Sequence, residues 1–227
     1  MAGEDGTTAA AGPTPPPRDW AAIIRARLAN TEPRHAVEEW RVPGLSAADS
    51  QLHRRYFPAN PTPAAVLMPL VEGPTLSVLL TQRATQLRNH AGQIAFPGGR
   101  IEAGGESEKG AALREAYEEI GLDSRFIEVI GYLPDHVVMT GFRVTPVVAF
   151  VRRGFELKLD ATEVEDSFEV PLGYLFDPGN HRLKRRASVA GDEVEFHEIP
   201  FGERVIWGAT AGMLHTLYRV CTEPQAP

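Results

Sequence analysis

Apolar side chains recur along this chain with two different spacings, and these spacings predict an alternation of helices and strands. From Asp19, the expected N-cap, to Leu28 the apolar residues fall every three or four positions, which is typical of a helix that packs one face against a core. A polar connection from Asn30 to Pro63 leads to two short apolar runs, Ala64 to Val71 and Leu76 to Gln82. The Glu-Gly-Pro-Thr between these runs indicates a β-hairpin.

The same spacings predict the remaining elements. Strands are expected over residues 126–132, 144–151, 183–189 and 194–199, and helices over residues 107–120, 172–176 and 209–220. Strands and helices interleave without an internal repeat, which is typical of one α/β domain built on a mixed sheet. We expect a disordered N-terminal tail over residues 1–18, the first helix and its connection over residues 19–63, and the domain over residues 64–227.

The predicted helix from Ser107, its expected N-cap, to Ile120 has two faces of opposite character. The face expected to pack on the core contains Leu113, Ala116, Tyr117 and Ile120. At about 100° per residue, Glu115, Glu118 and Glu119 fall within an arc of roughly 100° on the other side. These like charges repel one another, and only Arg114 offsets them nearby.

Hard divalent cations such as Mg²⁺ and Mn²⁺ prefer carboxylate oxygens and bridge them to substrate phosphates, so the three glutamates are candidate metal ligands. For the helix taken alone, the alternative is a solvated acidic face. Immediately before the helix stands the glycine-rich segment Phe96-Pro97-Gly98-Gly99-Arg100-Ile101-Glu102-Ala103-Gly104-Gly105-Glu106. Glycine lacks a β-carbon, so this backbone can approach a metal ion or a phosphate closely. A simple turn is the alternative for either glycine pair.

Composition limits the partners of such a site. The 227 residues carry a net charge of −7, which disfavours nucleic acid, although a local basic patch can still hold a small phosphorylated ligand. The single cysteine, Cys221, cannot form an internal disulfide, and the sequence contains no C-x-x-C or Cys/His cluster that indicates a zinc site. Neither a secretory signal nor an apolar run of the roughly 18 residues that a membrane span requires is found. We therefore expect a soluble, cytoplasmic protein that binds a small nucleotide, neither nucleic acid nor a membrane, with a homodimer left open.

From Glu106 onward, the order Glu106, Arg114-Glu115, Glu118-Glu119 and Gly121-Leu122 resembles the Nudix box position for position. The resemblance implies a Nudix-type α/β/α sandwich with a mixed β-sheet, and a hydrolase that cuts a pyrophosphate linkage with Mg²⁺ or Mn²⁺. It also implies that Glu115, Glu118 and Glu119 bind the metal and take part in catalysis.

Two further expectations concern the loop before the helix. By resemblance, the Gly99 carbonyl is a further metal ligand, and Glu106 forms an ion pair with Arg114 that holds the loop against the helix. A role for Glu106 only as a partner of the helix dipole is the alternative. Six residues separate Gly99 from Glu106, one more than in the usual box, so Arg100 stands where the first glycine of the box falls.

Upstream of the box, a second group of residues resembles the signature of the coenzyme A pyrophosphatase branch of the Nudix family, which also tolerates the longer loop. The matching residues are Leu80-Thr81-Gln82-Arg83-Ala84, Leu87-Arg88, His90, Gly92 and Phe96-Pro97-Gly98-Gly99. This resemblance implies hydrolysis of coenzyme A or its thioesters to 3′,5′-ADP and (acyl) 4′-phosphopantetheine.

Within that signature, Arg83 and Arg88 are the candidate phosphate ligands, because one guanidinium group can donate two hydrogen bonds to a phosphate. Gly98 and Gly99 are the candidates for backbone contacts with the same substrate. Pairing of these arginines with surface acids is the alternative. His90 can contact phosphate or only order the loop. A base that activates water is expected in the box or in the acidic stretch after it.

The candidate in that stretch is Glu163, and the start of a solvated helix is the alternative reading of the residue. Two other functions remain open. One is a Nudix pyrophosphatase for ADP-ribose, dinucleotides or another nucleoside diphosphate derivative. The other is a non-catalytic module that binds nucleotides, although all carboxylates of the box are present.

Overall fold

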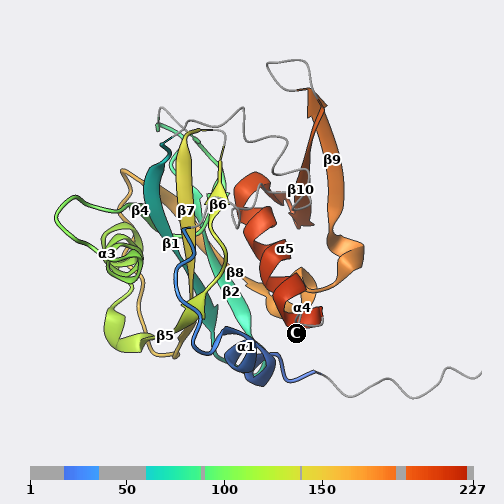
Figure 1. Ribbon diagram of the computed structural model, residues 1–227, viewed down its shortest axis with the longest axis horizontal. Helices are drawn as coiled ribbons and strands as arrows, with labels where there is room; N and C mark the ends of the chain where they lie inside the picture. The colour runs from blue at the N-terminus through green and yellow to red at the C-terminus, as the bar shows by residue number, and fades with distance from the viewer. Residues whose placement is uncertain (1–17, 36–59, 88–89, 139, 188–192, 224–227) are drawn as a thin grey trace, which may run out of the picture.

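The computed structural model describes residues 18–35, 60–87, 90–138, 140–187 and 193–223 of the chain (Figure 1). Of the predicted disordered tail over residues 1–18 only Arg18 is described, and residues 36–59 of the predicted connection also lie outside the described part. The division of the chain into tail, connection and domain stays a prediction.

Eight strands of the described residues form one mixed sheet. They are β1 (Thr62–Val71), β2 (Ser77–Arg83), β3 (Ile94–Ala95), β4 (Gly98–Arg100), β5 (Ile127–Tyr132), β6 (His136–Val137), β7 (Phe142–Val151) and β8 (Val164–Pro171). Their order is β3-β2-β1-β7-β5, with β4 beside β1, β6 beside β7 and β8 beside β2. β1 and β7 run parallel, with Thr62 opposite Phe142 and Val71 opposite Val151, whereas the other pairs are antiparallel.

A smaller sheet and the helices complete the fold. The smaller sheet has the order β11-β10-β9, from β9 (Arg182–Ala187), β10 (Glu193–Phe201) and β11 (Arg204–Trp207). The helices are α1 (Trp20–Leu28), α3 (Glu108–Ile120), α4 (Leu172–Leu175) and α5 (Gly208–Thr222), with 3₁₀ turns η3 (Ser124–Phe126) and η4 (Pro178–Asn180). Across the described ranges, no helix is long and apolar enough to span a bilayer.

Helices cover both faces of the large sheet, α3 on one side and α1 and α5 on the other (Figure 1). Side chains of β1 alternate between the two sides: Ala65 and Leu67 pack with α3, whereas Met68 and Leu70 pack in the cluster that contains α1 and α5. Because both faces are buried, β1 is apolar at nearly every position. The architecture is the expected α/β/α sandwich with a mixed sheet.

Within the described residues, each predicted helix and strand is present within two residues of its expected ends, and β1 and β2 form the expected antiparallel pair. The end of the strand predicted over residues 183–189 lies outside the described residues, which stop at residue 187 there. The apolar pattern does not predict β8, because Glu165, Asp166 and Glu169 interrupt it. β8 nevertheless pairs with the whole length of β2. The alternative that Glu163 begins a solvated helix is wrong, since this residue lies in the turn before β8.

Candidate functional site

Helix α3 positions the acidic side chains, and both of its ends are fixed locally. The Ser107 hydroxyl accepts a hydrogen bond from the Gly110 N–H at 3.1 Å, and Gly121 ends the helix with φ 68°, a left-handed conformation that favours glycine. The buried face consists of Ala111, Ala112, Ala116, Glu119 and Ile120. Tyr117, predicted on the core face, is 63% exposed, so that prediction is wrong. The helix is rotated so that its alanines face the sheet and Glu119 is buried with them.

Glu119 is a buried carboxylate, only 3% exposed, with two partners in the described residues. The Gly98 N–H donates to its Oε2 at 3.1 Å, and the Arg83 guanidinium lies 3.6 Å from its Oε1. Burial raises the pKa of Glu119 to about 7, and the charges of Glu163 and Glu115 add to this effect, while Gly98 and Arg83 oppose it. The protein alone therefore stabilises a negative charge at Glu119 only in part.

Glycines bring the backbone of β4 into close contact with α3 and β1. A β-carbon at Gly99 would lie 2.3 Å from Glu115 Oε1, and one at Gly98 would lie 2.4 Å from the Ala65 carbonyl oxygen. Only glycine fits at either position without moving its neighbour. Burial also raises the pKa of Glu115, against the effect of the adjacent Arg114.

Arg114 connects the loop to the helix. Its Nε and Nη2 donate to the two carboxylate oxygens of Glu106 at 2.9 and 3.2 Å, so the pair expected from the sequence is present as a bidentate contact. Its Nη1 donates to Glu115 at 2.9 Å and to Glu118 at 3.0 Å. Nη2 also donates to the Arg100 carbonyl at 3.0 Å. Because Arg100 meets Arg114 through its backbone, the position that departs from the usual box does not need glycine for this contact.

The two remaining acidic candidates are more exposed. The Glu118 side chain is 57% exposed and is held by Arg114 one helical turn earlier. Glu163 is exposed, and its carbonyl accepts the Ala84 N–H at 2.9 Å, which fixes the turn before β8 to the end of β2. Its charge acts on both Glu115 and Glu119. The structure thus brings Glu163 to the same acidic centre, although it is far from α3 in the sequence.

Arg83 lies at the end of β2 beside this centre. Its Nη1 contacts Glu119, whereas its Nε is buried and has no hydrogen-bond partner in the described residues. A buried donor without an acceptor is uncommon, and an anionic ligand is one acceptor that fits it. The alternative that Arg83 pairs with a surface acid is wrong, because its acidic partner is buried.

The other signature residues differ in what the structure describes. Arg88 lies outside the described residues. His90 is exposed, and its Nδ1 lies 2.8 Å from Gln93 Oε1, a contact that orders the turn leading into β3. A cavity of about 820 Å³ in the described part of the chain is lined by Gln82, Gly92, Ile94 and the β10–β11 turn. None of the glutamates of α3 lines it, but Gln82 adjoins Arg83 along β2.

The donor set fits a hard divalent cation. Glu115 and Glu119 have raised pKa values, Glu118 and Glu163 add further carboxylates, and glycine backbone approaches them from β4. Such cations take carboxylate and carbonyl oxygens and keep several waters. A bound cation offsets the repulsion between these carboxylates.

Comparisons with known proteins agree with one another. The family profile described as NUDIX domain matches residues 61–187. Two curated relatives described as "Uncharacterized Nudix hydrolase NudL", from Salmonella paratyphi B and Salmonella newport, are each 40% identical over 161 residues, which is 70% of this chain and 82% of the relative.

Solved structures show a more distant likeness. A Nudix hydrolase from M. smegmatis, RenU, is 21% identical with a TM-score of 0.49, over 73% of this chain and 89% of that one. The NUDIX domain of Shewanella oneidensis NrtR, crystallised with ADP ribose, is 20% identical with a TM-score of 0.39, over 57% and 85% of the two chains.

Proposed function

The chain belongs to the Nudix hydrolase family, and from that premise we propose that it hydrolyses the pyrophosphate linkage of coenzyme A or its thioesters. The products are 3′,5′-ADP and (acyl) 4′-phosphopantetheine. The family accounts for pyrophosphate hydrolysis with a divalent metal in general terms, and the substrate is the part that we propose.

One observation carries the proposal: a partly exposed guanidinium, whose buried Nε–H has no acceptor among the described residues, lies directly beside a buried carboxylate. Arg83, which belongs to the coenzyme A signature, contacts Glu119, which belongs to the Nudix box. A phosphate that accepts from Arg83 therefore lies next to the candidate metal ligands. The neighbouring Gln82 lines the 820 Å³ cavity, which offers room for a ligand longer than the pyrophosphate itself.

The side chains divide the work as follows. Arg83 binds a phosphate, the Gly98 N–H fixes Glu119, and Arg114 orients Glu115 and Glu118. Glu115, Glu118, Glu119 and the Gly99 carbonyl would hold Mg²⁺ or Mn²⁺, which would supply polarisation of the phosphoryl group and a lowered pKa for water. We assign to Glu163 the role of accepting the proton from the attacking water.

Product identification tests the substrate. Coenzyme A, an acyl-coenzyme A and ADP-ribose are incubated separately with the full chain and Mg²⁺, and the nucleotide products are separated by chromatography. We expect 3′,5′-ADP from the two coenzyme A substrates and little AMP from ADP-ribose. Turnover of ADP-ribose with indifference to coenzyme A would select the nucleoside diphosphate alternative, and no turnover of any substrate would favour a nucleotide-binding module.

The role of Glu163 has its own test. Glu163→Gln keeps the shape of the side chain but removes the base, so kcat is expected to fall by about 10²- to 10⁴-fold with little change in KM. Glu165→Gln, an exposed carboxylate two residues along β8, is the matched control. Equal kcat in the two variants and the wild type would remove Glu163 from the mechanism.

The setting of the enzyme is also part of the proposal. The buried free thiol of Cys221 and the absence of any other cysteine support a reducing, cytoplasmic compartment. The net charge of −7 supports a small nucleotide rather than nucleic acid as the partner. Self-association into a homodimer is tested by light scattering coupled to size-exclusion chromatography.

A further inference from the structure

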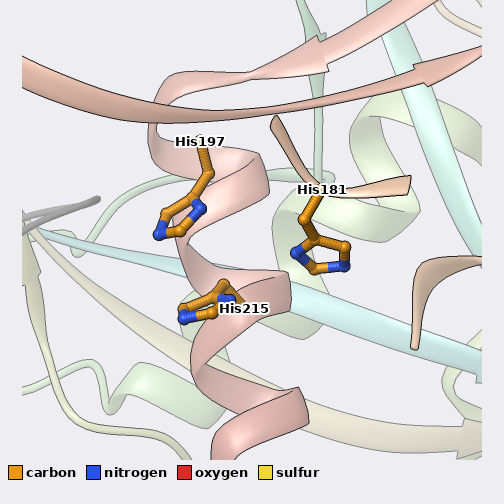
Figure 2. Close-up of side chains that lie close together, drawn as sticks. All are labelled: His181, His197 and His215. Atoms are coloured by element: carbon orange, nitrogen blue, oxygen red, sulfur yellow. The ribbon is translucent and has the colours of Figure 1, made fainter. Parts of the chain in front are cut away.

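Three histidines outside the glutamate site lie together on the opposite side of the large sheet, and we propose that they form a second metal site for a zinc-class dication. They are His181, His197 and His215, and one ligand atom from each lies within 4.8 Å of the others. Figure 2 shows the three rings gathered in one place, with one ring nitrogen of His181 facing the other two rings. The sequence contains no compact Cys/His motif, and the fold alone brings these residues together.

Each histidine comes from a different element. His181 follows η4 and precedes β9, His197 lies in β10, and His215 lies in α5. The rings of His197 and His215 are stacked, with centroids 4.1 Å apart, and that of His181 lies 5.7 Å from the ring of His215. The site therefore joins the last helix to the smaller sheet, whereas the glutamates lie on α3, on the far face of the large sheet.

The ring nitrogens are available as ligands. Nδ1 of His197 and Nδ1 of His215 are both buried and have no hydrogen-bond partner in the described residues. Buried polar atoms normally have a partner, so these two ring nitrogens indicate a bound acceptor, donor or cation. The Nε2 of His181 lies 2.6 Å from the Leu175 carbonyl oxygen, so this nitrogen carries the proton. Nδ1 of His181 then keeps its lone pair, in the arrangement by which a carbonyl orients a metal-binding histidine.

The surroundings favour the neutral imidazole at two of the three histidines, His215 and His197. Burial, together with the neighbouring histidines and Arg219, lowers the pKa of His215 to about 4, against the effect of Glu223. Burial also lowers the pKa of His197, as does His181. A neutral imidazole is the form that binds a metal, so these nitrogens need not lose a proton at neutral pH.

Imidazole also determines which metal fits. Zinc and other late first-row dications prefer imidazole nitrogen, whereas Mg²⁺ prefers the carboxylate oxygens of α3. Zn–N bonds of about 2.0–2.1 Å in a tetrahedral site place ligand nitrogens roughly 3.3 Å apart, so the rings must turn slightly to close on the ion. Three protein ligands leave a fourth position for water.

Binding of Zn²⁺ and Co²⁺ to the metal-stripped full chain tests the proposal. Saturating Mg²⁺ is present to occupy the glutamate site. We expect one Zn²⁺ per chain by calorimetry, a rise in Tm, and the visible absorption of tetrahedral Co²⁺. His215→Gln should weaken Zn²⁺ binding by more than the roughly 10- to 100-fold that loss of an outer partner of a metal ligand costs. His35→Gln, which removes an imidazole elsewhere, should bind like the wild type.

Two further measurements keep the test decisive. If His215→Gln does not fold, His181→Gln replaces it, and imidazole NMR signals of the wild-type chain are followed during the Zn²⁺ titration. Broadening or shifts at His181, His197 and His215 alone are expected, with no such change on adding Mg²⁺. Equal Zn²⁺ affinity in the wild type and the cluster variants, or no change at these three rings, would overturn the proposal.

Discussion

At the scale of single residues, we expect a substitution at Gly99 to lower activity without lowering stability. In Gly99→Ala the new methyl group would collide with the end of the Glu115 side chain, 2.3 Å away. That carboxylate can swing aside, so we expect the free energy of unfolding to change little. Its displacement by about 1 Å is expected to reduce turnover by roughly 100-fold. Unfolding curves and initial rates of hydrolysis measure the two effects.

Gly173→Ala in α4 is the matched control, because a β-carbon there meets no atom within 4 Å. It should leave both the unfolding curve and the hydrolysis rate close to those of the wild type. A Gly99→Ala variant with wild-type turnover would show that the contact with Glu115 does not position a reacting group.

We expect replacement of Arg83 to lower kcat/KM even when the positive charge is kept. Lysine at this position keeps a positive charge near Glu119 but lacks the guanidinium fork that suits a phosphate. Hydrogen bonds to charged groups are worth about 1.5–3 kcal/mol, so Arg83→Lys should lower kcat/KM by roughly 10- to 150-fold. Steady-state kinetics with coenzyme A measure this loss, and an unchanged kcat/KM would remove Arg83 from the substrate site.

At the scale of elements, the contact between Glu106 and Arg114 joins the glycine-rich loop to α3. A double-mutant cycle with Glu106→Gln and Arg114→Lys measures the coupling between the two side chains. Because the pair is bidentate and partly buried, we expect a coupling of about 0.5–3 kcal/mol in the free energy of unfolding. The exposed pair of Arg25 and Glu128, also bidentate, is the control, with an expected coupling of about 0–1 kcal/mol.

A coupling at Glu106 and Arg114 no larger than that of the exposed pair would contradict a structural role for their contact. The hydrolysis rate of the same variants separates two effects. Loss of Arg114 also frees Glu115 and Glu118, whereas loss of the Glu106 charge does not. Arg114→Lys should therefore lower activity more than Glu106→Gln does.

The elements themselves follow largely from local patterns in the sequence. Helix α3 could be predicted because Ser107 caps it and its apolar residues recur at helical spacing up to Ile120. The rotation of the helix about its axis could not be predicted, because burial of Glu119 and exposure of Tyr117 depend on contacts with β1 and β4. Strand β8 could not be predicted from the apolar pattern for a similar reason, because pairing with β2 outweighs its charged residues.

The candidate site shows the same division. The resemblance to the Nudix box identifies Glu115, Glu118 and Glu119 from one short segment. The approach of Glu163 depends on the turn before β8, and sequence spacing does not contain that information. The histidine cluster is a stronger case, because three separate elements supply it and the chain carries no local motif for it.

At the scale of the whole molecule, we expect resistance to acid to depend partly on Glu169, which links β8 to Arg153 after β7 and to Ser77 at the start of β2. Burial raises the pKa of Glu169, but hydrogen bonds from Arg153, at 2.6 Å to each carboxylate oxygen, and from Ser77 outweigh it and lower the pKa overall. A lowered pKa stabilises the folded state above the ordinary glutamate pKa of about 4.3, and this contribution is lost as the pH falls through the lower folded value.

Glu169→Gln should therefore lower Tm at pH 7, and its difference from the wild type should shrink as the pH falls below about 4. Thermal unfolding followed by circular dichroism between neutral and acidic pH measures the difference. Glu156→Gln, an exposed carboxylate, is the control and should follow the wild type throughout. A Tm difference for Glu169→Gln that stays constant with pH would contradict this role.

The parallel pairing of β1 with β7 also governs how the chain is made. Thr62 and Phe142 lie opposite each other in the sheet but are 80 positions apart in the chain. At a synthesis rate of about 5–20 residues per second, β1 leaves the ribosome roughly 4–16 s before its central partner. During that interval β1, which is apolar on both faces, has only its short pairings with β2 and β4 and lacks β7, the strand that pairs with its whole length. We therefore expect β1 to be the segment that molecular chaperones bind on the nascent chain.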